Sequence, residues 1–132
     1  MARFIFLDEG ARDFWVDWAA AARGVVGTLH LYAGRHPSDP RLAELIGDLS
    51  LRDNDFRRWW ADHDVYTRTN GTKRYRHPVV GDLVLGYEAF VAADDIDQTL
   101  GPHTAEAGSP SEERLKLLAC WAAAPDLRAP AP

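Results

Sequence analysis

Histidine is the residue type in this chain best suited to chemistry, because imidazole binds metals and transfers protons near neutral pH. The five histidines are His30, His36, His63, His77 and His103. A protein zinc site needs several converging ligands, usually including a pair that is close in sequence. None of the histidine spacings matches such a pattern, although Asp62 and Asp64 flank His63. We therefore expect no metal site and no bound cofactor.

The sequence gives little support for nucleophilic catalysis. Cys120 is the one cysteine and follows the apolar run Leu117-Leu118-Ala119, a setting in which a thiol is inert. The chain has no Gly-x-Ser-x-Gly turn, no phosphate-binding glycine loop and no His-Glu-x-x-His pair. The residues favour a binding protein over an enzyme.

Aromatic side chains are the strongest remaining signal. The chain has five tryptophans, and four of them fall on apolar helical stripes: Trp15, Trp18, Trp59 and Trp60. Such rings pack as ordinary core, but they can also line a cavity that the chain does not fill. The second alternative predicts a pocket for a small apolar ligand.

Helices are predicted wherever apolar residues recur at three- and four-residue steps. The first is one long helix that begins near Asp8, buries a stripe from Phe14 to Ala33, and ends near Gly34. The second begins at Asp39-Pro40 and the third follows Asp53. These predicted helices take up most of the first half of the chain.

The last helix has the clearest predicted start. Ser109-Pro110-Ser111-Glu112 is a capping box with proline at the first helical position. We expect its buried stripe to be Leu115, Leu118, Ala119 and Ala122. Residues 123–132, rich in alanine and proline, are predicted to be a flexible tail.

A β-hairpin is predicted around the turn Pro78-Val79-Val80-Gly81, where polar and apolar residues alternate on both sides. That period predicts one shared face for Tyr75, Leu83, Leu85 and Tyr87, and therefore an odd number of loop residues. Asn70-Gly71 is predicted to be the turn leading into the sheet. A third strand is expected from Gln98 to Glu106, interrupted by Gly101-Pro102.

These elements predict one α+β domain over residues 1–122, with the helices over one face of an antiparallel sheet. The predicted pocket lies between that face and the helices. Its expected lining is Trp18, Val25, Trp60, Tyr75, Leu83, Leu85 and Tyr87.

Charge and length limit the functions that the protein can have. The 132 residues carry a net charge of −5, and no apolar run is long enough to span a membrane. The basic residues between Arg52 and Arg76 are either a solvated face or a phosphate-contacting patch. The acidic balance and the lone cysteine favour a cytoplasmic protein that does not itself bind DNA.

Five motifs occur in an order that resembles a known family. They are Asp17-Trp18, the run from Trp60 to Val65, the run from Gly71 to Pro78, the run from Val80 to Glu88, and the run from Gly108 to Glu112. Together they resemble the ligand-binding family of MmyB-like transcription regulators, from about Arg3 to Ala119.

The resemblance implies a PAS-like fold that senses a small, fatty-acid-like molecule. It also implies an N-terminal helix-turn-helix of the XRE type in full-length relatives, mainly from actinobacteria. This sequence departs from the family pattern twice. The family's opening strand pair does not precede Arg3, and Gly101-Pro102 replaces an apolar pair.

The leading hypothesis is a non-catalytic sensor domain of a bacterial transcription regulator, without its DNA-binding domain. An enzyme would instead need titratable groups converging in a cleft. A second rival is a strand-edge interaction or homodimerisation module, because missing strands would leave an unpaired sheet edge. The third is a regulator remnant that binds no ligand.

Overall fold

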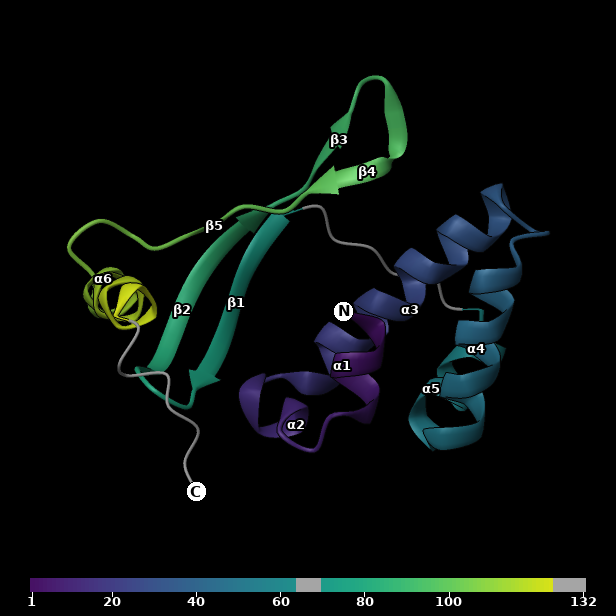
Figure 1. Ribbon diagram of the computed structural model, residues 1–132, viewed down its shortest axis with the longest axis horizontal. Helices are drawn as coiled ribbons and strands as arrows, with labels where there is room; N and C mark the ends of the chain where they lie inside the picture. Colours follow the sequence, from purple (N-terminus) through teal and green to yellow (C-terminus); the bar gives the residue numbers. More distant parts are fainter. Residues whose placement is uncertain (64–69, 125–132) are drawn as a thin grey trace.

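The computed structural model describes residues 1–63 and 70–124, which form the α+β domain that the sequence predicts (Figure 1). The helices are α1 (Ala2–Leu7), α2 (Ala11–Phe14), α3 (Trp18–Arg35), α4 (Pro40–Arg52), α5 (Asn54–Ala61) and α6 (Pro110–Ala123). The strands are β1 (Asn70–His77), β2 (Gly81–Glu88), β3 (Phe90–Ala92), β4 (Asp95–Leu100) and β5 (His103–Thr104). Residues 64–69 and the predicted tail from residue 125 lie outside the described residues.

The prediction of one long first helix is wrong. The chain forms α1, α2 and α3 instead, with breaks at Asp8 to Gly10 and at Trp15 to Asp17. At the second break the N–H of Val16 donates to the carbonyl of Arg74 in β1. Asp17 then begins α3, its carboxylate accepting from the N–H of Ala20. A backbone hydrogen bond to the sheet thus replaces the helical bond that periodicity favours.

Helices α4 and α5 begin where their caps predict. The Asp39 carboxylate accepts from the N–H groups of Arg41 and Leu42, and Pro40 occupies the first helical position. The Asp53 carboxylate accepts from the N–H of Phe56. Because an N-cap compensates backbone donors that the helix leaves unpaired, these starts follow from local chemistry.

The hairpin of β1 and β2 has the predicted register. Tyr75 lies opposite Leu83, and His77 lies opposite Gly81, so the loop has an odd number of residues as expected. Asn70-Gly71 is not a turn but the start of β1, paired with Glu88 and Tyr87. Gly71 has a φ of 147°, and an added Cβ there would lie 3.3 Å from the Tyr87 ring. Glycine is therefore favoured at position 71 because of its positive φ and because the Tyr87 ring lies close to it. A turn is not the reason.

The prediction of a single third strand is also wrong. Its region divides into β4, which pairs with β3 as a separate two-stranded sheet, and the short β5, which pairs with β2. Gly101-Pro102 lies at the division. Because proline lacks an N–H, Pro102 contributes only its carbonyl, which accepts from the N–H of Glu88.

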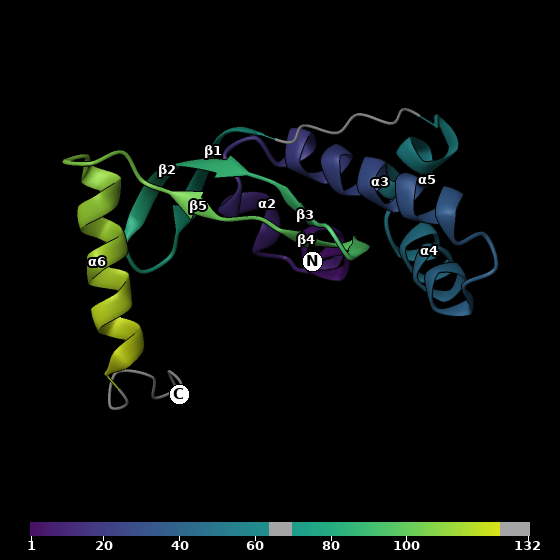
Figure 2. The ribbon, with the colours of Figure 1, turned by 90° about the horizontal axis from the view of Figure 1, so that it is seen from above.

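Helix α6 takes the place of a strand along part of β2. Beyond the short β5, the N–H of Val84 donates to the Ser111 hydroxyl at 2.9 Å, and the Arg114 guanidinium donates to the Asp82 carbonyl. The rest of α6 projects away from the sheet (Figure 2). Ser111 is its one buried residue, so the predicted buried stripe is wrong. Ala119 is exposed, and Leu115, Leu118 and Ala122 are only partly buried.

The helices lie on both sides of the hairpin. Helices α3, α4 and α5 gather at one end of the molecule, α1 and α2 lie between them and β1, and α6 lies beyond β2 (Figure 1). We expected the helices to cover one face of the sheet. The aromatic rings that contact Tyr75 are those of Phe14, at the end of α2, and of Trp15. The break before α3 brings these rings to the sheet.

Candidate ligand-binding site

One face of the hairpin combines a buried apolar part with a partly buried polar end. Tyr75, Leu83 and Leu85 are 9%, 4% and 6% exposed. The strand register places Lys73 and Tyr87 on the same face, and His103 of β5 lies opposite Tyr87. This sheet face, defined by Lys73, Tyr75, Leu83, Leu85, Tyr87 and His103, is the candidate site.

Aromatic rings cover the buried part of the sheet face. The Phe14 and Trp15 ring centroids lie 5.3 Å and 6.3 Å from that of Tyr75. Trp15 also forms an isolated β-bridge with Tyr75, so backbone pairing fixes the position of its ring. The sequence suggested tryptophans as pocket walls but assigned this role to Trp18 and Trp60, not to Trp15.

The Tyr75 hydroxyl is the first group of a short chain of hydrogen bonds. It lies 2.9 Å from Nε2 of His103, whose Nδ1 lies 3.0 Å from the carbonyl of Gly101. Burial raises the pKa of Tyr75 to about 12, so its phenol is protonated at neutral pH. A carbonyl oxygen only accepts, so Nδ1–H of His103 donates to the Gly101 carbonyl.

Lys73 supplies a positive charge to the polar end. Its ammonium lies 4.2 Å from the centroid of the Tyr87 ring, a cation–π contact. Burial lowers the pKa of Lys73 because desolvation disfavours the charged form. Our sequence reasoning missed both Lys73 and His103. The parity that placed Tyr75 on this face also places Lys73 there, whereas no local signal brings His103 to Tyr87.

The structure places the other expected pocket residues in the helical half. Trp18 donates its indole N–H to the Ile5 carbonyl at 2.8 Å and contacts the rings of Phe6 and Trp59. Trp60 stacks on His30, with ring centroids 3.8 Å apart. These tryptophans thus have partners within the helices.

Val25 packs, partly buried, against the core cluster. That cluster includes residues of α1, α3 and α5 together with Tyr75, Leu83 and Leu85. The structure therefore brings Tyr75, Leu83 and Leu85 together, as the sequence predicts. It places Trp18 and Trp60 against other aromatic rings of the same core.

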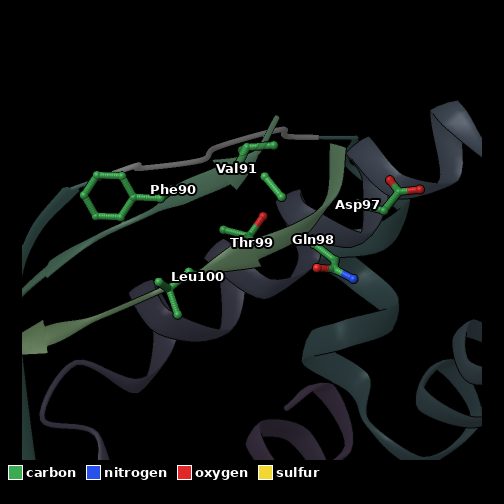
Figure 3. Close-up of a pocket in the computed structure, with 7 residues that line it drawn as sticks. Phe90, Val91, Asp97, Gln98, Thr99 and Leu100 are labelled. Atoms are coloured by element: carbon green, nitrogen blue, oxygen red, sulfur yellow. The ribbon is translucent and has the colours of Figure 1, made fainter. Parts of the chain in front are cut away.

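A concave surface lies on the β3–β4 hairpin (Figure 3). This open hollow of about 650 Å³ is lined by Phe90, Val91, Ala92, Asp97, Gln98, Thr99 and Leu100. The Arg35 and His36 side chains at the end of α3 bind Asp97 at 2.9 Å and 2.5 Å. Phe90, Val91 and Leu100 are each more than half exposed. Every residue of β3 and β4 is exposed, so the hollow has no buried floor.

Other kinds of site receive little support within residues 1–63 and 70–124. No group of three histidine, cysteine, aspartate or glutamate side chains is arranged to hold a metal ion there. No helix in this part of the chain is long and apolar enough to cross a membrane.

The sheet face combines a covered apolar part with a partly buried polar end. The comparison with protein families identifies the kind of domain to which it belongs. The family model described as "MmyB-like transcription regulator ligand binding domain" matches residues 1–118. Because the match spans most of the chain, this protein belongs to that family and is a ligand-binding domain of MmyB-like transcription regulators. No curated protein and no solved structure matches the chain.

Proposed function

We propose that the domain senses a small, fatty-acid-like molecule that binds against the sheet face, and that it does so without catalysis. The observation that carries this proposal is the change in side-chain burial from one end of the sheet face to the other. Leu83 and Leu85 of β2 are almost fully buried, whereas Tyr87, farther along β2, and Lys73, opposite Leu85 on β1, are only partly buried. An amphiphile has the same division into an apolar part and a polar end.

The expected affinity is moderate. Each methylene moved out of water contributes about 0.8 kcal/mol, and association costs several kcal/mol. A chain of roughly ten methylenes would therefore bind with a dissociation constant in the micromolar range. Binding to the folded state alone would also raise the melting temperature.

Calorimetric titration with dodecanoate and with 1-dodecanol tests this proposal. Saturable binding of either compound, together with a raised melting temperature, supports it. Tyr87→Ala should weaken binding, because Tyr87 lies on the proposed binding face and is only partly buried. Val84→Ala is the matched control, since Val84 lies on the opposite face and is 49% exposed. Absence of saturable binding of both compounds would overturn the proposal.

The proposed sensor acts in the cytoplasm and does not itself bind duplex DNA specifically. Its net charge of −5 disfavours a nucleic-acid footprint over the whole surface. Sequence-dependent, nanomolar binding of the purified chain to duplex DNA at physiological salt would contradict this part of the proposal.

A homodimerisation module is a second candidate function. The β3–β4 hairpin favours it, because Phe90, Val91, Ile96 and Leu100 are 53%, 57%, 63% and 68% exposed. Sedimentation velocity over a range of concentrations tests this alternative. A dimer that Phe90→Ser dissociates and Leu51→Ser leaves intact would support it. Leu51 is a suitable control because it is 86% exposed on α4. A monomer at every concentration would exclude it.

A further inference from the structure

We propose that His30 and His63 form an acid-sensitive contact between α3 and α5, and that protonation of His30 releases the end of α5 from α3. His30 lies on α3, and His63 follows the end of α5. The inference is independent of the ligand proposed above, because both histidines lie in the helical half of the domain. It gives the domain a second input, the proton concentration.

His30 is the outer ring of an aromatic stack that begins in the core. Trp60 stacks on Phe56 on one side and on His30 on the other, with centroid distances of 5.8 Å and 3.8 Å. Phe56 is 0% exposed, so the stack is anchored in the interior. It joins α3 to α5, which lie side by side (Figure 1). A charge on the His30 ring therefore acts directly on the packing of α5.

The His30 ring has a buried nitrogen that is not satisfied. Its Nε2 is shielded from solvent and has no hydrogen-bond partner among residues 1–63 and 70–124. The ring also forms a hydrogen bond with the backbone of Trp60. Protonation makes both imidazole nitrogens donors, and Nε2–H would then lack an acceptor. A buried charge without a partner is unfavourable, so the folded domain favours neutral His30.

His63 opposes a charge on His30. The two ring centroids lie 5.3 Å apart. The Nδ1 of His63 lies 2.7 Å from the carbonyl of Ala61, which holds the ring in place. Like charges this close repel, so each positive ring disfavours the other. His63 is exposed and can exchange protons with the solvent.

The charged side chains around α3 and α5 do not offset this repulsion. Several are held in ion pairs, which are Arg3 with Asp48, Arg12 with Asp53 and Asp55, Arg35 with Asp97, and Arg58 with Asp55. The others are exposed, namely Asp13, Arg23, Arg41, Glu44, Arg52, Arg57 and Asp62. Within the described residues, the charge that acts on His30 is that of His63.

The pKa of His30 gives the sign of the response. Burial lowers this pKa from 6.5 and the charge of His63 lowers it further, whereas the hydrogen bond to the Trp60 backbone raises it and is outweighed. The stability linked to neutral His30 is therefore present above the unfolded value of about 6.5 and is lost as the pH falls below it. The competing effect is a cation–π attraction between a charged His30 and Trp60, which would reverse the sign.

Urea unfolding of the full chain at about pH 7.5 and about pH 5.5 tests the proposal, because imidazole gains its charge in this range. Phenylalanine in His30→Phe keeps a ring on Trp60 but cannot be charged. The parent should lose more stability than His30→Phe on acidification, and hydrogen-exchange protection of α5 should fall in the parent alone. His77→Phe is the matched control, because it removes a partly buried histidine from the hairpin and should leave the acid response as in the parent.

Equal losses of stability in the parent and in His30→Phe would overturn the proposal. A smaller loss in the parent would also overturn it, since the cation–π attraction would then dominate. Should His30→Phe not fold, His63→Asn decides the question. Asparagine tolerates the left-handed backbone at position 63, where φ is 52°, and it removes the repelling charge. Its loss of stability in acid should be smaller than that of the parent, and an equal loss would exclude the role of the histidine pair.

Discussion

The hydroxyl of Tyr75 lies 2.9 Å from Nε2 of His103, a contact between residues 28 positions apart that joins β1 to β5 across β2. It ties the shortest strand of the sheet to the buried centre of the hairpin. Because the buried phenol is held protonated, this contact gives the domain a specific response to alkaline pH.

We expect ionisation of Tyr75 to lower the free energy of unfolding as the pH rises from about 10 to about 12. Its pKa is raised from 10.0 to about 12 in the folded state, so the fold favours the protonated form. The associated stability is therefore present below pH 10 and is lost as the pH rises through about 12. The full loss is about 2 to 3 kcal/mol. Urea unfolding at both pH values, for the parent and for Tyr75→Phe, measures it.

Tyr75→Phe serves as the reference because other groups titrate in the same range. The pKa of Lys73 is lowered by burial, so Lys73 contributes in the opposite direction, but it is present in both proteins. The parent should lose more stability than Tyr75→Phe on alkalinisation. Equal losses in the two proteins would mean that the Tyr75 phenol is not buried as described.

Aspartate should be tolerated much better at position 87 than at position 85. Leu85→Asp would bury a carboxylate at a site that is 6% exposed, at a cost of several kcal/mol. Tyr87 is only partly buried and lies beside the Lys73 ammonium, which could pair with a new carboxylate. Thermal melting of the two variants gives the comparison. Similar melting temperatures would contradict the assigned geometry of the sheet face.

Ser111→Ala should destabilise the domain by about 1 to 3 kcal/mol, because it leaves the N–H of Val84 without its acceptor. Ser111 is 5% exposed, so water does not readily replace the lost hydroxyl. Hydrogen exchange at the Val84 amide should accelerate together with the loss of stability. Ser38→Ala, at an exposed position before α4, is the control and should change neither measurement.

Asp97→Asn should loosen the β3–β4 hairpin without unfolding the domain. Burial raises the pKa of Asp97, but hydrogen bonds from Arg35 and His36 outweigh this effect and lower its pKa overall. Asparagine keeps the shape of the side chain but removes the charge that both partners bind. Amide exchange should accelerate in β3 and β4 and stay unchanged in β1. Unchanged exchange in β4 would show that this ion pair does not hold the hairpin, as is common for exposed pairs.

Local chemistry was sufficient to predict much of this fold. The starts of α4, α5 and α6 follow from Asp39, Asp53 and Ser109, whose side chains accept from the N–H groups of their own first turns. The hairpin register follows from the two-residue period of β1 and β2, because one slip would expose Leu83 and Leu85. The family also followed from the order of short motifs. In each case the determining residues are close in sequence.

Tertiary structure decided the rest of the site. Periodicity continued the first helix through Trp15, but the bond from the Val16 N–H to the Arg74 carbonyl ended it and brought Trp15 to Tyr75. Nothing near His103 in sequence predicts its contact with Tyr75, since β5 is too short to have a period. Such contacts depend on which backbone groups, far apart in sequence, can form hydrogen bonds with one another. That pairing depends on the positions of all the elements together. The sequence alone therefore determined which hairpin residues share the sheet face, whereas the fold brought His103 beside them and decided which rings cover them.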